Sequence, residues 1–243
     1  MDLRWEILAP YAKLFVTGTW MTVQLTVIAL VFGLMAGLMI GLVTAQPQQG
    51  LKQLLRWLFK AYAGFFRGTP LFVQILLVHF AFMPVLINPS DGLLVSGEAA
   101  RELRQEHGAF LSGVLALTLN AAAYISEIVR AGIESIPKGQ IEAGKALNLK
   151  PWEIFRFVIL KPALKAIYPA LTSQFILLML SSAVVSVISA DDLTSVAANL
   201  QSQTFRSFEI YIVVTAIYLA LALSFSALFK LIYQRVLNYP DRR

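Results

Sequence analysis

Residues 14–45 read LFVTGTWMTVQLTVIALVFGLMAGLMIGLVTA, and no charged side chain stands between Lys13 and Lys52. A helix needs about 20 mostly apolar residues to cross the hydrocarbon core of a bilayer, so this run is long enough. It is far longer than the apolar core of a cleaved signal peptide, which has about 7–15 residues, and no small-residue cleavage site ends it. The run therefore predicts a membrane-spanning helix that ends near Ala45, before a turn at residues 46–50.

Four further stretches have the same character. Residues 68–90, 166–190 and 210–229 carry no charge, and residues 108–129 carry only Glu127. The whole chain is 58% hydrophobic and only 14% charged, whereas about 25% of the residues of a soluble domain are charged. We therefore expect a single all-α integral membrane domain over residues 1–243. Its five transmembrane helices are expected at residues 17–45, 67–88, 108–130, 166–189 and 209–232.

The charges of the loops predict the orientation of these spans. Most of the 20 lysines and arginines fall in residues 52–67, 130–165 and 230–243, which lie on one side of a five-span chain. The loops of the other side are acidic, and they carry Asp91, Glu98, Glu102, Glu106, Asp191 and Asp192. Because basic loops remain in the cytoplasm, we expect the N-terminus outside and the C-terminus in the cytoplasm.

The composition also excludes several kinds of chemistry. The chain has no cysteine and only two histidines, so neither a disulfide framework nor a thiolate or histidine-rich metal site is expected. The net charge of +6 follows the membrane topology, and no nucleic-acid partner is expected. No nucleophile and base can be paired within the spans, so we expect no catalytic residues and no enzyme activity on this chain.

The cytoplasmic loop at residues 133–162 is too long and too patterned for a simple connection. Its first part, from Pro137 to Leu147, predicts a short helix that begins with proline and ends before Asn148, a residue that tolerates a left-handed conformation. Pro151 is expected to open a second helix, residues 152–160, which Pro162 closes. By its physics alone this helix–turn–helix is equally suited to lying on the lipid surface and to docking a cytoplasmic partner.

The sequence of this loop resembles a known motif. Residues 141–149 read IEAGKALNL and resemble the EAA loop of binding-protein-dependent ABC importer permeases. The family pattern is Glu-Ala-Ala, three residues, Gly, nine residues, then Ile-x-Leu-Pro. Here Gly144 replaces the second alanine, Asn148 replaces the glycine, and the proline falls one residue late, at Pro162.

Three other segments show the same resemblance in the expected order. Residues 65–74 read FFRGTPLFVQ, similar to the FRGTPLLVQ stretch of the polar amino acid branch of the family. Residues 123–133 read AYISEIVRAGI and residues 184–188 read VVSVI, and both are similar to stretches of that branch. The resemblance thus covers spans two to four and implies a permease with the fold of the type I ABC importers.

The resemblance implies a mechanism and a set of partners. The first short helix would be the coupling helix, which seats in a groove on a dimer of separate cytoplasmic ABC ATPases. The residues of this contact would be Gln140, Glu142, Ala143, Gly144, Lys145, Ala146, Leu147 and Asn148. The chain contains no G-x-x-x-x-G-K-[ST] phosphate loop, so ATP and Mg would bind to the ATPase.

The same resemblance implies a second permease subunit, identical or different, and a periplasmic or lipoprotein solute-binding protein that delivers a polar amino acid to the acidic outer face. The setting would be the bacterial cytoplasmic membrane and its lipids. The alternative is a standalone ion-coupled transporter, which usually shows internal repeats and more spans; the sequence shows no clear repeat.

Polar side chains within the spans are costly in lipid and therefore mark a candidate substrate path. The candidates are Gln74, Asn120, Tyr124, Glu127, Gln174, Ser181 and Ser182. Amides in membrane helices also simply bond to neighbouring helices, and the two interpretations are equally weighted here. For Glu127 we favour a structural ion pair, with Arg130 three residues later or with Arg67 on the neighbouring span.

The spans show two further features, a missing charged pair and a regular spacing of glycines. Many relatives carry Lys-Asp where this chain has Leu180-Ser181, so a charged site there would become a neutral hydroxyl site, unless that pair serves only the structure. Gly33, Gly37 and Gly41 recur every four residues in the first span, and this spacing predicts close packing against another helix.

Overall fold

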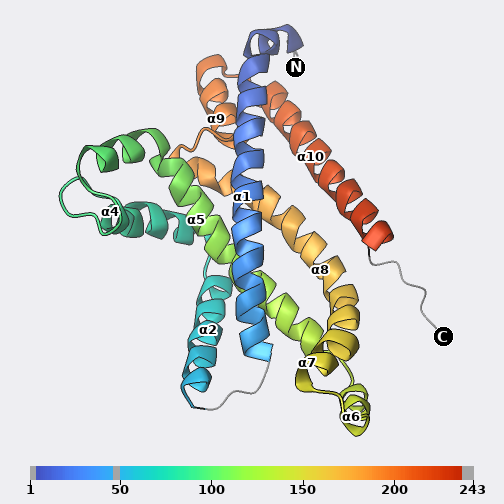
Figure 1. The fold of residues 1–243 in the computed structure, drawn as a ribbon. Coiled ribbons are helices and arrows are strands. Elements are labelled where there is room, and N and C mark those ends of the chain that lie inside the picture. Colours follow the sequence, from blue (N-terminus) through green and yellow to red (C-terminus); the bar gives the residue numbers. More distant parts are fainter. Residues whose placement is uncertain (1–3, 46–49, 237–243) are drawn as a thin grey trace.

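The computed structural model describes residues 4–45 and 50–236, and almost every segment of them is helical (Figure 1). The predicted all-α membrane fold is confirmed. The turn predicted at residues 46–50 lies mostly outside the described residues, as do Arg242 and Arg243. The elements are η1 (Trp5–Tyr11), α1 (Ala12–Ala45), α2 (Leu51–Gly68), α3 (Leu71–Leu77), η2 (Val78–Phe82), α4 (Met83–Leu86), α5 (Gly97–Glu134), α6 (Lys138–Ala146), α7 (Pro151–Glu153), η3 (Ile154–Ile159), α8 (Leu160–Ser181), η4 (Ser182–Ile188), α9 (Leu193–Thr204) and α10 (Ser207–Val236).

Among the described residues, four continuous helices are long and apolar enough to cross a membrane. They are Trp5–Ala45, Gly97–Glu134, Pro151–Ile188 and Ser207–Arg235. A fifth crossing is possible if the bent pair Leu51–Gly68 and Leu71–Leu86 counts as one span. The chain is therefore a multi-pass membrane protein with four spans, or five with the bent pair.

The second predicted span, residues 67–88, begins at a sharp bend. The helix Leu51–Gly68 and the helical run Leu71–Leu86 meet there at 111°. Thr69 is extended there, with φ −121° and ψ 149°, because the ring of Pro70 disfavours the helical conformation of the residue before it. The proline also brings no N–H to continue the helical ladder. The bend thus follows from Pro70 within the predicted span.

Pro162 does not close a second short helix in the loop, contrary to the prediction. The helix that begins at Pro151 continues through Pro162 into α8 and on to Ile188. The wider π-helical segment η3 immediately precedes this proline. Such a bulge loosens the hydrogen-bond ladder where a proline would otherwise clash with the carbonyl four residues earlier. After the turn that follows α6, the chain is consequently helical from Pro151 into the next span.

α1 and α5 pack together along the centre of the molecule, where α1 crosses in front of α5 and α8 (Figure 1). Gly33, Gly37 and Gly41 are buried at this contact. A Cβ atom on Gly37 would lie 2.7 Å from the Cβ of Ile125, closer than side chains can approach. The glycines therefore let the two backbones come together, as their spacing predicts.

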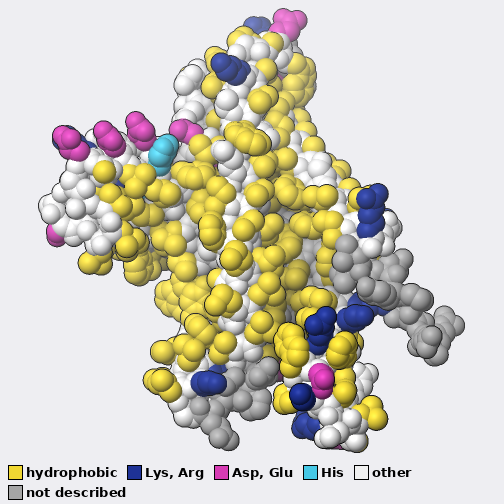
Figure 2. Space-filling view, viewed as in Figure 1, with side chains coloured by type: hydrophobic (Ala, Val, Ile, Leu, Met, Phe, Trp, Pro, Cys, Tyr) yellow, Lys and Arg dark blue, Asp and Glu magenta, His cyan; other side chains and the backbone are white. Residues whose placement is uncertain are grey.

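The charged side chains separate to opposite ends of the fold. Figure 2 shows carboxylates gathered over the start of α5, and lysines and arginines around α6 and α7 at the other end. Hydrophobic side chains cover the surface between them. This distribution agrees with an apolar belt inside the bilayer and a basic cytoplasmic end.

Candidate functional site: the coupling loop and the polar groups of the spans

α6 is a short helix that projects from the basic end of the molecule (Figure 1), and most of its surface is exposed. Glu142, Ala143 and Lys145 are exposed on it, and Gly144 is the one residue of α6 that is buried. Leu147, at its C-terminal end, is 75% exposed.

The turn after α6 is built by Asn148. This residue has φ +57°, the left-handed conformation expected from the sequence, which asparagine tolerates better than most residues. The N–H of Leu149 donates to the carbonyl of Gly144 (3.1 Å), and the N–H of Asn148 donates to that of Lys145 (2.9 Å). This is the Schellman arrangement, which satisfies the last carbonyls of a helix.

The face of α6 that carries Gly144 packs against the next helix. A Cβ on Gly144 would lie 3.2 Å from Cγ1 of Ile154, and Ile154 is buried. The backbone N–H of Lys150 donates to the carboxylate of Glu153 (2.7 Å), which holds the start of the second helix. The glycine that departs from the family pattern therefore lies against η3, whereas Gln140, Glu142, Ala143, Ala146 and Asn148 remain exposed.

A cluster of charges lies inside the basic end. Glu127 accepts hydrogen bonds from Arg130, with 2.8 Å between Oε2 and Nη2, and Nη1 of Arg67 is 3.4 Å from the same oxygen. Arg130 also bridges to Glu134. The guanidinium of Arg67 lies 5.7 Å from the ring centre of Tyr124. The structure thus brings both arginines named by the sequence to Glu127.

This charge cluster lines a cavity of about 440 Å³ between α5, α8 and the end of α2. Arg67, Glu127 and Ser135 are its polar residues, and Gly132, Ala166 and Ala170 are among those that leave it open. The cavity is large enough for a small solute. A solute with both a carboxylate and an ammonium group would find a partner for each there.

Gln74 and Asn120 form a second polar group at the bend between α2 and α3. The side chain of Gln74 is 2% exposed, and its amide donates to the carbonyls of Phe66 (2.7 Å) and Thr69 (3.0 Å). Asn120 on α5 donates to the oxygen of Gln74 (2.9 Å). These amides replace bonds that the helix loses at Pro70, so the geometry favours the structural interpretation for this pair.

The remaining candidates lie elsewhere. Gln174 and Ser181 are half-buried on α8, and Ser182 is buried, where its hydroxyl donates to the carbonyl of Met179 (2.6 Å). Within the described part of the chain, no hydrogen bond joins these three residues to the charge cluster or to Gln74.

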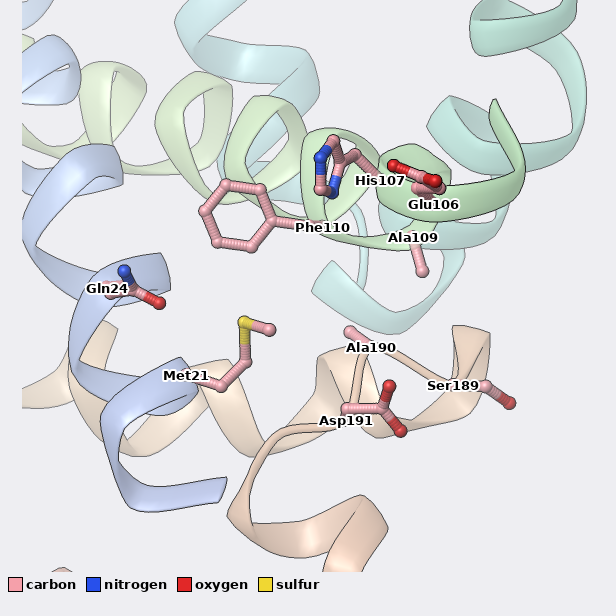
Figure 3. Close-up of a pocket in the computed structure, with 9 residues that line it drawn as sticks. All are labelled: Met21, Gln24, Glu106, His107, Ala109, Phe110, Ser189, Ala190 and Asp191. Carbon is pink, nitrogen blue, oxygen red and sulfur yellow. The ribbon is translucent and has the colours of Figure 1, made fainter. Parts of the chain in front are cut away.

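A pocket of about 250 Å³ opens at the acidic end, and sequence reasoning did not single it out (Figure 3). Side chains from three segments surround it. They are Met21 and Gln24 of α1, Glu106, His107, Ala109 and Phe110 of α5, and Ser189, Ala190 and Asp191 of the link to α9. Acidic loops indicated this end in general, but only the tertiary structure brings the three segments together.

Asp192, next to this pocket, fastens the start of α9. It accepts hydrogen bonds from the N–H of Thr194 (3.0 Å) and from the hydroxyl of Ser195 (2.7 Å). Burial raises the pKa of this carboxyl above its ordinary value, and the bonds from Ser195 and Thr194 offset part of that rise. The N–H of Leu193 donates to the hydroxyl of Thr22 on α1 (3.1 Å), so the cap also ties α9 to the first span.

A multi-pass helical membrane domain with a projecting, Schellman-terminated loop helix is typical of permease subunits of transporters. The family described as "Binding-protein-dependent transport system inner membrane component" matches residues 33–238. The chain belongs to this family. Among the described residues, no group of three or more histidine or carboxylate side chains is arranged to hold a metal ion.

Individual relatives agree with this assignment. The octopine transport system permease protein OccM of Rhizobium meliloti is 34% identical over 194 residues, 77% of this chain and 74% of OccM. The arginine transport system permease protein ArtQ of Bacillus subtilis is 33% identical over 180 residues, 74% of each chain. A crystal structure of an amino acid ABC transporter with histidines superposes with a TM-score of 0.76 at 35% identity, covering 97% of this chain and 100% of that one.

Proposed function

We propose that this chain is the permease subunit of an ATP-driven importer that moves a polar amino acid, or a close analogue, across the bacterial cytoplasmic membrane. The observation that carries the proposal is α6, a helix that buries only Gly144 against its own chain and leaves the other residues of the EAA-like motif accessible. The two relatives named for amino acid derivatives, OccM and ArtQ, support the substrate class.

In this proposal α6 is the coupling helix. A dimer of cytoplasmic ABC ATPases holds ATP and Mg and receives α6 in a groove, with Glu142 and Lys145 as its polar contacts and Leu147 as its apolar one. Closure of the ATPases then moves the loop. Because the helix from Pro151 continues unbroken into α8, a displacement of the loop is transmitted to that span as a rigid movement.

Two further partners complete the transporter. A second permease subunit, identical or different, forms the other half of the pathway, and a solute-binding protein delivers the substrate to the acidic end. The pocket between Gln24, Glu106 and Asp191 lies at that end and suits the ammonium group of an arriving amino acid. The cavity beside Arg67 and Glu127 lies toward the cytoplasmic exit.

A charge reversal on α6 tests the proposal. We expect Glu142→Lys to leave the chain in the membrane but to abolish both substrate-stimulated ATP hydrolysis and uptake by the assembled transporter in vesicles. Glu6→Lys serves as the control, because it makes the same charge change on an exposed residue of η1, the short helix before α1. If Glu142→Lys retains uptake at the level of the control, α6 does not couple to an ATPase.

The same vesicles separate this mechanism from that of a standalone ion-coupled transporter. An ATP-driven importer stops when ATP is withdrawn and continues when ionophores collapse the ion gradients. The opposite response would establish the ion-coupled alternative.

A further inference from the structure

α2 has two faces of opposite chemistry. At 3.6 residues per turn, Leu51, Leu54, Leu55 and Leu58 fall on one side of the helix, whereas Lys52, Arg56 and Lys60 recur every four residues on another. The helix contains no aspartate or glutamate. Figure 2 shows hydrophobic side chains with a basic one among them at the place of α2.

The chain itself covers neither face. Ala63 is the one buried residue of α2. Leu51 is 82% exposed and Leu58 is 58% exposed, and both Lys52 and Lys60 are exposed. The leucines are unfavourable in water, and the lysines are unfavourable in hydrocarbon. A helix with both faces open is stable only where water and hydrocarbon meet.

Its contacts place α2 at the basic end of the molecule. Nε of Arg56 donates to the carbonyl of Thr44 (3.1 Å), at the last turn of α1. Arg67, at the end of α2, reaches Glu127 near the last turns of α5. The 111° bend then turns α3 and α4 away from the direction of α2. The second half of α2 runs on to the middle of α5, where the hydroxyl of Tyr62 donates to the carbonyl of Leu119 (2.6 Å). The first half, which carries the leucines and lysines, therefore lies beside the helix ends that the charge distribution places at the cytoplasmic surface.

We propose that the first half of α2, residues 51–60, is an interfacial segment that binds anionic phospholipids of the cytoplasmic leaflet, with Lys52 and Lys60 on the headgroups and the leucines among the acyl chains. A groove of about 340 Å³ is lined by the four leucines and by Lys52. This lining matches a lipid, whose acyl chain lies next to a charged headgroup. The absence of carboxylates on α2 selects an anionic occupant. If a second copy of this protein packed its α2 against this one, like charges would be brought together.

The absence of cysteine in the chain gives a direct test. A single Leu58→Cys substitution carries a fluorescent label, and the purified full chain is reconstituted with brominated phosphatidylglycerol or brominated phosphatidylcholine at equal mole fraction. Leu223→Cys serves as the control, because Leu223 is 61% exposed on α10, in the interior of a span. Both positions are exposed, so the substitutions leave the packed core unchanged.

We expect the label at position 58 to be quenched more strongly by the brominated anionic lipid, with a relative preference of roughly fivefold for one cation at the surface. The preference should fall at high salt, since screening shortens the reach of the charges. It should be lost in Lys52→Gln/Lys60→Gln and retained in Lys138→Gln/Lys150→Gln, which removes the same charge from the loop around α6. The label at position 223 should show no preference.

Three results would overturn the inference. Equal quenching by both lipids at position 58 means that α2 lies in lipid without selecting anionic headgroups. Quenching by aqueous iodide in place of lipid means that the leucine face is in water. Protection from both quenchers means that another protein surface covers it. Because none of these readouts depends on uptake, failure here is distinguishable from failure of the proposed transport function.

Discussion

Gly33→Ala places a methyl group where α1 and α5 are in close contact. The new Cβ would lie 2.8 Å from the Cβ of Ala121 and 3.4 Å from the carbonyl oxygen of Thr118. Ordinary contacts between such atoms start at 3.4 Å, so the helices must separate by several tenths of an ångström. Overpacking of this kind costs about 1–3 kcal/mol. The free energy of unfolding should fall by that amount relative to a glycine-to-alanine change in open space.

Gly64→Ala provides that reference. No atom lies within 4 Å of a Cβ built on Gly64 in α2, so the change only reduces the flexibility of the unfolded chain and should stabilise by about 0.5–1 kcal/mol. The difference between the two variants removes the helix propensity of alanine from the comparison. What remains is the cost of the contact with α5.

Ala121→Gly removes the methyl group on α5 that the new Cβ at position 33 would contact. In the double variant Gly33→Ala/Ala121→Gly, the methyl group is on α1 and its place on α5 is empty. The nearest remaining atoms are then the oxygen of Thr118 at 3.4 Å and the nitrogen of Ala122 at 3.5 Å, which are ordinary contacts. A double-mutant cycle should therefore show a favourable coupling of about 1–3 kcal/mol.

The measurement is SDS-induced unfolding in mixed micelles, followed by circular dichroism. It compares the wild type, the single variants Gly33→Ala, Gly64→Ala and Ala121→Gly, and the double variant. The reasoning is refuted if Gly33→Ala is as stable as Gly64→Ala, or if Ala121→Gly lowers the stability of the Gly33→Ala chain as much as it lowers that of the wild type.

Substitutions at three other residues test individual polar groups. Gln74→Leu removes the donor to the Phe66 carbonyl. Because a buried acceptor left without a donor costs about 1–3 kcal/mol, the free energy of unfolding should fall by that amount. An unchanged free energy of unfolding would contradict the role of this amide at the bend. Glu127→Gln removes the carboxylate partner of Arg130, so we expect lower thermal stability with an unchanged KM for uptake, whereas a raised KM at full stability assigns Glu127 to the substrate. Asp192→Ala loses the cap of α9 and about 1 kcal/mol, whereas Asp192→Asn keeps a capping oxygen. Since burial raises the native pKa of Asp192 above the unfolded one, the wild type gains stability as the pH falls through the raised pKa. In unfolding measurements the wild type should therefore gain stability relative to Asp192→Asn as the pH falls from neutral, and a constant difference would contradict it.

Local signals were sufficient for the class of the protein and for the turn that follows α6. Charge-free runs predicted membrane helices because hydrocarbon excludes charges over a fixed thickness. Asn148 predicted the turn after α6 because a left-handed residue is needed at that point of a Schellman ending. The glycine spacing in α1 predicted a close helix contact, although it did not name α5 as the partner.

Local signals misjudged both prolines in the predicted helices. Pro70 was placed near the start of a span, and the sequence analysis did not predict the bend of 111° between the helices before and after it. Pro162 was expected to end a helix, but α8 continues through it. The sequence around a proline states which hydrogen bond is lost, and only the surroundings decide how the loss is accommodated. At Pro70 the amide of Gln74 supplies donors, and before Pro162 a π-helical segment makes room.

The sequence by itself determined the helical membrane fold, the basic and acidic ends, and the loop that carries the family motif, because each depends on neighbouring residues or on a period along one helix. Only the tertiary structure decided that Arg67 meets Glu127 as well as Arg130 does, that Gln74 serves the bend, and that three segments enclose the outer pocket. These contacts join residues far apart in the chain. Their existence depends on how rigid helices are placed against one another, which no local pattern encodes.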